Sequence, residues 1–359
     1  MGPFRFKNVC IESMAVNLPD QEVTSAELED QLAPLYQRLQ IPFGTLEKLS
    51  GVKARRLWPR ATMPSAVSTV AAERAIEKAG IKREQIEVVI NCSVTRDFFE
   101  PATACIIHQN LKLPEQTAAF DITNACIGFS NGLLQAATMI EAGVVKVALV
   151  TSGETITPIV ESTVHHLQKN NDVQRDDLLK ILPTFTLGCG AVAYILTHES
   201  LSRTLNASKQ KPKLIGAVAR SATDHSDLCA GNADYQLFDN AQVSPLMYTE
   251  SAKLMAAAAK LGGRMFKDFS EQIGWSREDV QHTFCHQVGK QVNDAFYREM
   301  GLDIEKEFTV YKTLGNLVSA ALPTCLAIGA EEKGIKSGEK VLLTAFGSGL
   351  NSIFLGFVW

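Results

Sequence analysis

Residues 120–132 read FDITNACIGFSNG, and within this stretch a strand-like sequence gives way to a helix of small residues at Cys126. The strand pattern begins at Thr117 and the helical pattern continues to Gly143. A thiol at a helix N-terminus feels the positive end of the helix dipole, which favours the thiolate over the ordinary pKa of about 8.5. The stretch therefore predicts a strand-to-helix turn that presents a nucleophilic cysteine. The small neighbours that let this helix pack closely beside the sulfur are Ala125, Gly128, Ser130 and Gly132.

The same pattern occurs a second time, at an offset of about 190 to 195 residues. The segment GNLVSAALPTCLAIGAEEKG (315–334) repeats the helix and puts Asn316 in the place of Cys126. Two further pairs of segments echo each other: 79–86 with 273–280, and 143–153 with 338–347. Strand-like and helical runs alternate in both copies, which indicates α/β architecture. We therefore expect two homologous halves related by pseudo-twofold symmetry, residues 1–205 with the cysteine and residues 206–359, with the polar stretch 197–213 as the seam between them.

His286 is a third candidate, because it follows the strand-like QHTFC at the place of the turn 91–93 in the first half. Pseudo-twofold packing would bring all three turns to one end of the sheets, where open α/β sheets bind ligands. A cysteine can carry an acyl group covalently, and N–H groups of a histidine and an asparagine can hold an enolate-like oxygen. Taken singly, each residue is more often structural: a buried thiol, a core imidazole or an N-cap. Their coincidence at equivalent turns favours catalysis.

Composition and charge exclude several classes of protein. The net charge of −4 and the pI of 6.0 give no basic surface for nucleic acid. The sequence has neither an apolar run long enough to span a bilayer nor a secretory leader, so we expect a cytoplasmic protein. Eight cysteines occur singly, with no C-x-x-C pair, which fits a reducing compartment and argues against a zinc or dithiol site.

Two local patterns resemble cofactor sites, and neither is convincing. Residues 188–193 (GCGAVA) match the dinucleotide fingerprint G-x-G-x-x-A but run into a strand-like sequence instead of opening a helix, so we expect close backbone packing there. His165 and His166 lie in the charged stretch 161–177, which we interpret as a surface insertion, and no ligand neighbours them at metal-binding spacing. We therefore expect no metal and no cofactor beyond the thioester substrates.

At this point the sequence resembles the ketoacyl synthase III branch of the thiolase superfamily, and within it the OleA-type condensing enzymes of bacterial long-chain olefin synthesis. The resemblance covers nearly the whole chain and implies the five-layer αβαβα thiolase fold in an obligate homodimer. The motifs that carry it are SGVKARRLW (50–58), NCSVTRDFFEPATA (91–104), FDITNACIGFSNG (120–132), TLGCGA (186–191), RSAT (220–223), HQV (286–288), GN (315–316) and FGSGLN (346–351).

The resemblance also implies roles for individual residues. Cys126 matches the acyl-accepting nucleophile, and His286 with Asn316 matches the pair that stabilises the enolate of the second substrate. The backbone N–H groups of Cys126 and Ser348 would form the oxyanion hole. Glu100 matches a glutamate that reaches the active site of the neighbouring subunit; the alternative is that Glu100, beside Pro101 and near Arg96, caps or salt-bridges a loop of the dimer. Two departures from the pattern are Gly289, where relatives have Asn or Ser, and Ile127, which we expect to alter the shape of the acyl channel.

Three functions follow from these residues. The first is a non-decarboxylative Claisen condensation of two acyl-CoA molecules to a β-keto acid, in which Glu100 removes an α-proton. The second is a decarboxylative 3-oxoacyl-ACP synthase III reaction, in which malonyl thioester supplies the carbanion and no strong base is needed. The third is a catalytically idle, dimeric acyl-binding subunit, which the intact Cys126, His286 and Asn316 disfavour. Acyl chain length, CoA against acyl carrier protein as donor, and the downstream pathway stay open at this stage.

Overall fold

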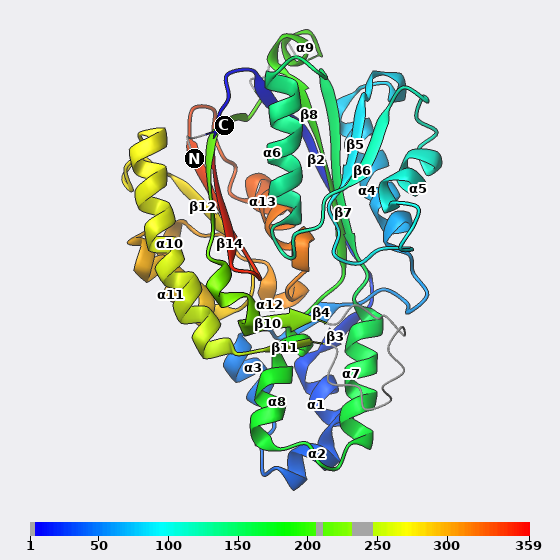
Figure 1. The fold of residues 1–359 in the computed structure, drawn as a ribbon, viewed down its shortest axis with the longest axis vertical. Coiled ribbons are helices and arrows are strands. Elements are labelled where there is room, and N and C mark those ends of the chain that lie inside the picture. Colours follow the sequence, from blue (N-terminus) through cyan, green and yellow to red (C-terminus); the bar gives the residue numbers. More distant parts are fainter. Residues whose placement is uncertain (1–3, 206–210, 232–246) are drawn as a thin grey trace.

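The computed structural model describes residues 4–205, 211–231 and 247–359, and its described part has five layers (Figure 1). Helices α10 and α11 form one outer layer, and α4 and α5 form the other. Between them lie two blocks of strands that enclose a central layer of α6 and α13. The helices of these layers are α4 (Pro64–Ala79), α5 (Thr103–Asn110), α6 (Gly128–Glu141), α10 (Ser251–Ile273), α11 (Lys290–Met300) and α13 (Ala321–Glu332).

The two blocks of strands have equivalent topology, which confirms the duplicated fold. In the first half the order is β6-β5-β7-β8-β2, and in the second half it is β12-β13-β14-β9. Strands β5 and β7 are parallel, as are β12 and β13, while β7–β8 and β13–β14 are antiparallel. The counterpart of β6 is a single parallel bridge between Thr283 and Glu307. The strands are β2 (Val9–Asn17), β5 (Val88–Asn91), β6 (Ala118–Asp121), β7 (Val147–Glu154), β8 (Gly190–His198), β9 (Lys213–Ser221), β12 (His282–Cys285), β13 (Lys340–Gly347) and β14 (Asn351–Val358).

The central helices are buried on nearly every side, which explains their small and apolar residues. A helix that is apolar all round belongs in a core, and both helices contribute to one hydrophobic cluster shared by the two halves. Gly132 of α6 lies so close to Cys92 that an added Cβ would overlap the sulfur, and a Cβ on Gly329 of α13 would lie 2.5 Å from the rings of Phe284 and Phe308. Glycine is therefore required where these helices approach the sheets.

A smaller cap with its own hydrophobic core covers one end of the layers. The charged stretch 161–177, which we expected to be a surface insertion, belongs to this cap, because its residues Val164, Leu167 and Val173 are buried in the cap core. The surface-insertion interpretation was therefore wrong, because the alternating charged residues occupy only the outer face of two amphipathic helices. The cap elements are β3 (Glu22–Thr24), β4 (Ala54–Arg56), α1 (Ser25–Gln31), α2 (Ala33–Arg38), α3 (Thr45–Ser50), α7 (Thr157–Lys169) and α8 (Arg175–Ile181).

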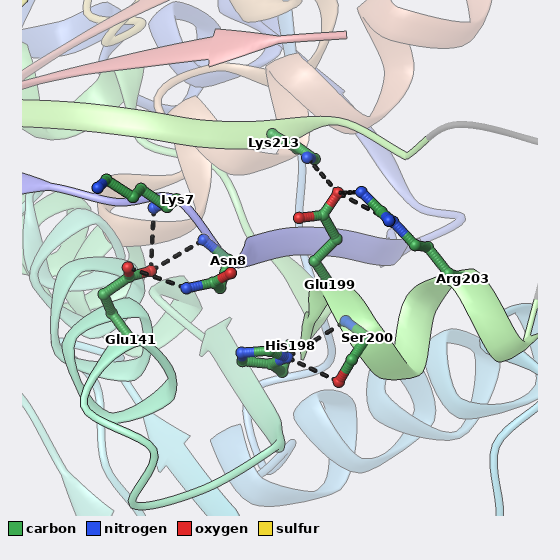
Figure 2. A network of polar contacts seen from close by, with 8 residues as sticks. All are labelled: Lys7, Asn8, Glu141, His198, Glu199, Ser200, Arg203 and Lys213. Atoms are coloured by element: carbon green, nitrogen blue, oxygen red, sulfur yellow. Dashed lines mark hydrogen bonds and ion pairs between the residues drawn. The ribbon is translucent and has the colours of Figure 1, made fainter.

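Polar contacts at the end of the sheets opposite the cap tie α6 to the N-terminal segment and, through Glu199, join the two halves (Figure 2). Glu141, the last residue of α6, accepts hydrogen bonds from the backbone N–H groups of Lys7 and Asn8 at 3.0 and 2.9 Å. Glu199 accepts from Lys213 of the second half and from Arg203. The seam is thus partly helical, since it contains α9 (Glu199–Leu205).

The predicted boundary between residues 205 and 206 borders residues 206–210, which lie outside the described part of the chain, and it stays a prediction. Among the described helices none is long and apolar enough to cross a membrane. The remaining short elements are β1 (Phe4–Arg5), β10 (Cys229–Gly231), β11 (Met247–Thr249), α12 (Tyr311–Leu314), η1 (Arg83–Gln85), η2 (Leu182–Thr186), η3 (Thr223–Leu228), η4 (Ile304–Lys306) and η5 (Val318–Ala320).

Candidate active site

One cavity of about 840 Å³ lies between the cap and the ends of the sheets, and Cys126, His286, Asn316 and Ser348 all line it. Cys126 follows β6, His286 follows β12 and Ser348 follows β13, so these three residues come from the carboxyl ends of strands in both halves. This is the end at which parallel strands of α/β folds place ligands. Much of the remaining wall is apolar and includes Ile156, Ile159, Met247, Leu254, Met255, Val292 and Phe296.

Cys126 lies in a tight turn two residues before α6, as the sequence predicted. The turn is closed by hydrogen bonds from Ile127 N to Asn124 O at 3.1 Å and from Gly128 N to Ala125 O at 3.2 Å. Ala125 has a φ of +44°, in the left-handed region that a residue with a Cβ adopts at a cost. Such strain directly before the candidate nucleophile indicates that the surrounding packing fixes the position of the thiol.

The expected lowering of the Cys126 pKa was wrong for the free protein. Burial in the largely apolar site raises its pKa to about 12, and nearby Cys229 and Glu154 add to the effect. A helix terminus contributes about 0.3 to 1 kcal/mol, less than one pKa unit, whereas desolvation can shift a buried group by several units. The resting thiol is therefore protonated, and its proton must leave during the attack on substrate.

His286 is a buried, neutral imidazole. Burial lowers its pKa to about 4, so it carries a single N–H at neutral pH. Its backbone N–H donates to Thr344 O at 3.0 Å, and its Nδ1 has no hydrogen-bond partner among the described residues. The next side chain, Gln287, accepts from Val310 N at 3.0 Å and so ties the end of β12 to α12. A buried ring nitrogen without a partner is suited to a substrate oxygen or a mobile proton.

The turn that carries Asn316 is held by the TLGCGA segment. Asn316 N donates to Thr186 O at 2.8 Å, and Gly188 N donates to Asn316 O at 2.9 Å. The side-chain carbonyl of Asn316 accepts from Val318 N at 2.9 Å, which leaves the amide NH₂ as a donor toward the cavity that Asn316 lines. Val318 is a β-branched residue with a φ of +54°, so this turn is strained like the one before Cys126.

The interpretation of residues 188–193 as backbone packing is confirmed. A Cβ on Gly188 would overlap the carbonyl oxygen of Leu314, and strand β8 begins at Gly190 where a dinucleotide fingerprint would open a helix. Residues 188–193 therefore pack directly against the turn that carries Asn316. Within the described residues no group of histidine, cysteine and carboxylate side chains has the arrangement of a metal site.

The loop that contains Ser348 packs directly against the Cys126 turn. A Cβ on Gly347 would lie 3.1 Å from the side chain and 3.3 Å from the backbone nitrogen of Ile127. Asn351 Nδ2 donates to Ser348 O at 3.3 Å and to Asn124 Oδ1 at 3.2 Å, which ties the loop to the turn. The two backbone N–H groups predicted to form an oxyanion hole, those of Cys126 and Ser348, thus belong to loops fixed to each other.

Glu100 lies apart from this group. It is exposed and does not line the cavity of its own chain, although Phe98 and Phe99 just before it do. The described residues show no ion pair between Glu100 and Arg96. A role of Glu100 in the cavity of a second subunit therefore stays a prediction.

The two departures from the family pattern have packing explanations. A Cβ on Gly289 would lie 2.6 Å from the carbonyl oxygen of Ser50, so the Asn or Ser of relatives would not fit without a shift. Ile127 is buried against Gly347 and does not line the cavity. The expectation that Ile127 shapes the acyl channel was therefore wrong.

Glu154 was missed by the sequence reasoning. It is fully buried, ends the strand β7 and lines the cavity next to the predicted residues. Burial raises its pKa, although donors from two loops surround it. A usable signal existed in the sequence, because the run VALVTSGE places a carboxylate at the end of an otherwise uncharged strand, where the second half has Gly347.

Two α/β halves around buried central helices, with a cysteine, a histidine and an asparagine in one cavity at the strand ends, define a condensing enzyme of the thiolase class. Comparison with known proteins agrees: residues 56–212 match the thiolase N-terminal domain, and residues 270–356 match the 3-oxoacyl-[acyl-carrier-protein] synthase III C-terminal domain. The chain belongs to the ketoacyl synthase III-like acyltransferases of the thiolase superfamily, in the group of the acyl-CoA:acyl-CoA alkyltransferases.

Two relatives and a solved structure support this assignment over the full length of the chain. An acyl-CoA:acyl-CoA alkyltransferase of Shewanella oneidensis is 36% identical, with 99% of this chain and 100% of the relative covered. The alkyltransferase of Xanthomonas campestris pv. campestris is 34% identical, with 99% of both chains covered. A crystal structure of a variant of Xanthomonas campestris OleA with bound lauric acid and lauroyl-CoA has a TM-score of 0.90 at 34% identity, covering 99% of this chain and 100% of that one.

Proposed function

We propose that the protein condenses two acyl-CoA molecules head to head, through an acyl group on Cys126, and releases a β-keto acid. The observation that carries the proposal is the single cavity that brings together Cys126 of the first half and His286, Asn316 and Ser348 of the second. Relatives named as acyl-CoA:acyl-CoA alkyltransferases support the choice of substrate. The volume of about 840 Å³ lies in the upper part of the range of roughly 300 to 1,000 Å³ for small-molecule sites, and the apolar wall suits alkyl chains.

The first half-reaction transfers an acyl group from CoA to Cys126. The sulfur attacks the thioester carbonyl, and the backbone N–H groups of Cys126 and Ser348 stabilise the oxyanion that forms. Because His286 is neutral, it can accept the thiol proton and return it to the departing CoA sulfur. One thioester is exchanged for another, so the step needs no other reactant.

The second half-reaction forms the carbon–carbon bond. Glu100 of a second subunit removes an α-proton from the second acyl-CoA, and N–H groups of His286 and Asn316 hold the enolate oxygen. The enolate carbon attacks the acyl group on Cys126 and expels the thiolate, and water then hydrolyses the β-ketoacyl-CoA. Two acyl-CoA and one water give one β-keto acid and two CoA. Every step is a proton transfer or an acyl transfer, chemistry that these side chains can perform, and we expect no metal or redox cofactor.

A homodimer is part of the proposal. Strand β6 lies at the end of the strand order in the described sheet, and Ala118 and Asp121 on it are exposed. Phe98 and Phe99 are 51% and 64% exposed in the single chain, next to Glu100. An open sheet edge beside exposed aromatic rings is a surface that natural proteins cover. A second copy seated there would bury these rings and bring its Glu100 toward the neighbouring cavity.

The donor and the compartment are proposals of the same kind. Acyl-CoA is the expected donor, with acyl carrier protein as the alternative. Free thiols and a CoA-dependent reaction fit the reducing cytoplasm, and each of the eight cysteines is free.

The proposal is tested with purified protein, one long-chain acyl-CoA and no malonyl thioester. Mass spectrometry follows free CoA and β-keto acid or its ketone breakdown product, with Cys126→Ala as the control. Formation of β-keto acid that depends on Cys126 supports the proposal. Acylation of Cys126 without condensation, relieved by malonyl thioester, would place the protein among the decarboxylative synthases. No acylation at all would favour a catalytically idle acyl-binding subunit.

A further inference from the structure

Glu154 is a fully buried carboxylate that bridges the two halves of the molecule beside the cavity. On one side it accepts hydrogen bonds from Val94 N at 2.8 Å, Thr95 N at 3.0 Å and Thr95 Oγ1 at 2.9 Å. Thr95 Oγ1 in turn accepts from Thr155 N at 3.1 Å. Val94 and Thr95 begin the segment that leads along the cavity wall to Glu100. The Glu154 carboxylate therefore fixes the first residues of that segment.

On its other side Glu154 holds the turn that follows Asn316. It accepts from the hydroxyl of Ser319, and the backbone N–H of Ser319 lies 3.4 Å from the same oxygen. The hydroxyls of Ser319 and Ser152 are 2.6 Å apart, which anchors Ser319 to β7 as well. Ser319 lies three residues after Asn316 and next to the strained Val318. The carboxylate therefore touches both segments that carry residues of the proposed second half-reaction.

We infer that Glu154 is a positioning residue for carbon–carbon bond formation. It fixes the position of the Asn316 turn relative to the segment that leads to Glu100. The inference rests on the proposed function, because it assigns Asn316 and Glu100 to the second half-reaction. The contacts of Glu154 do not include Ser348 or the backbone of Cys126, so acylation depends on it less. Burying a carboxylate costs free energy of folding unless the carboxylate is fully hydrogen-bonded. Here donors from two loops form hydrogen bonds with Glu154.

The chemistry of the site requires an acceptor at both carboxylate oxygens. Each of the hydrogen-bond partners of Glu154 named above is an N–H or a hydroxyl that donates, and a carboxylate oxygen without a proton can only accept. In Glu154→Gln the NH₂ group would face either the Thr95 N–H or the Val94 N–H and Ser319 hydroxyl. One of the two segments would then shift, and a displacement of about 1 Å can cost on the order of 100-fold in rate.

The test separates the two half-reactions in Glu154→Gln. Acylation is measured as CoA released in a single turnover with one acyl-CoA, and condensation as β-keto acid formed at steady state. We expect acylation within about threefold of wild type and condensation lowered by about 10- to 100-fold. Glu154→Asp keeps the carboxylate and should recover part of the condensation rate. If Glu154→Gln fails to fold, Ser319→Ala removes one bridge contact and should lower condensation alone by a few fold.

A matched control is Glu12→Gln, because Glu12 is another fully buried carboxylate but lies at the Lys211 seam, with an oxygen 3.1 Å from that ammonium group. It should lower stability and leave the ratio of the two half-reactions unchanged. Equal loss of both half-reactions in Glu154→Gln, or loss of neither, would overturn the inference. If wild type makes no β-keto acid from acyl-CoA alone, the proposed function fails instead. The bridge to Asn316 is then tested with malonyl thioester, and an unchanged condensation rate in Glu154→Gln would overturn it.

Discussion

The two hairpins at the centre of the halves, β7–β8 and β13–β14, share one frame but differ in how their strands are connected. Glu154 pairs with Gly190 at the end of the first, and Gly347 pairs with Asn351 at the end of the second. Residues 155–189 join the first pair and build α7, α8 and part of the cavity wall, whereas residues 348–350 join the second pair in a tight turn. The duplication thus supplies a symmetric frame, and the unequal connections make the two sides of the cavity different.

The two connections, which differ in length, also differ in how tightly they are held. The long connection shares the cap core with residues from 28–57, apart from the central layers, and can vary in shape while the sheet stays intact. The short connection is fixed by the side chain of Asn351 and by contact with Ile127, so Ser348 has little freedom. We expect substrate size to be set by the first connection and the acylation rate by the second.

The largest effect is expected at the one residue of the first half that reacts covalently. Cys126→Ala removes the acyl acceptor and leaves the second-half residues His286, Asn316 and Ser348 in place. CoA release and β-keto acid formation should each fall by at least about a thousandfold. Residual condensation near the wild-type rate, followed by mass spectrometry, would show that the second half works without the first.

The next effect concerns the second half alone. Asn316→Ala removes the side-chain NH₂ donor, and with it the side-chain carbonyl that accepts a hydrogen bond from Val318 N. Loss of one donor to a developing oxyanion costs roughly 100- to 1,000-fold, so condensation should fall by that factor while single-turnover acylation of Cys126 persists. A parallel loss of acylation, measured as CoA burst, would contradict the division of labour.

A matched pair of substitutions compares the two connections directly. Gly347→Ala puts a Cβ 3.1 Å from Ile127 in the tight turn, and acylation should fall by about 10-fold through displacement of Ser348. Ile159→Ala, in the cap wall, should change the preferred acyl length and leave the acylation rate of the preferred substrate within about threefold. Rates with a series of acyl-CoA lengths measure both, and the reverse pattern would refute the comparison.

The reactivity of Cys126 should depend on pH in an unusual way. Burial raises its pKa to about 12, with Cys229 and Glu154 contributing, so alkylation by iodoacetamide should keep rising above pH 9, where an ordinary thiol levels off. Alkylation that is already maximal at pH 8 would contradict this electrostatic description.

The last effect is on stability in acid and not on a rate. Burial lowers the pKa of His286 from an ordinary value of 6.5 to about 4, so between these values the unfolded chain binds a proton that the folded protein does not. The contribution is complete above pH 6.5 and is lost as the pH falls to 4, by about 3 kcal/mol in free energy of unfolding. Denaturant titrations of wild type and His286→Asn should show a shallower decline in the variant.

The sequence allowed the frame and the central residues to be predicted, because each depended on a repeated local pattern. The strand-to-helix turn at Cys126, the position of His286 after β12 and that of Asn316 before α13 all follow from the internal repeat. The charged stretch 161–177 was misjudged, since the amphipathic pattern does not reveal that a helix packs on a cap formed by residues far away in sequence.

The electrostatics could not be predicted from local sequence. The raised pKa of Cys126 comes from burial by both halves, and the role of Glu154 comes from contacts with Val94, Thr95 and Ser319. Such contacts exist only once the halves are packed. The surroundings of Glu100 could not be predicted from local sequence either, because the cavity that it is proposed to enter lies in another subunit.

The central claim is that one cavity joins two intact acyl groups without loss of a carboxyl carbon. The direct measurement uses acyl-CoA labelled with ¹³C at the thioester carbonyl, wild-type protein and no malonyl thioester. We predict intact β-keto acid with two labelled carbons and two molecules of CoA released for each molecule of acid. Label that stays on Cys126 until malonyl thioester is added, and then appears once in the product, would contradict the claim.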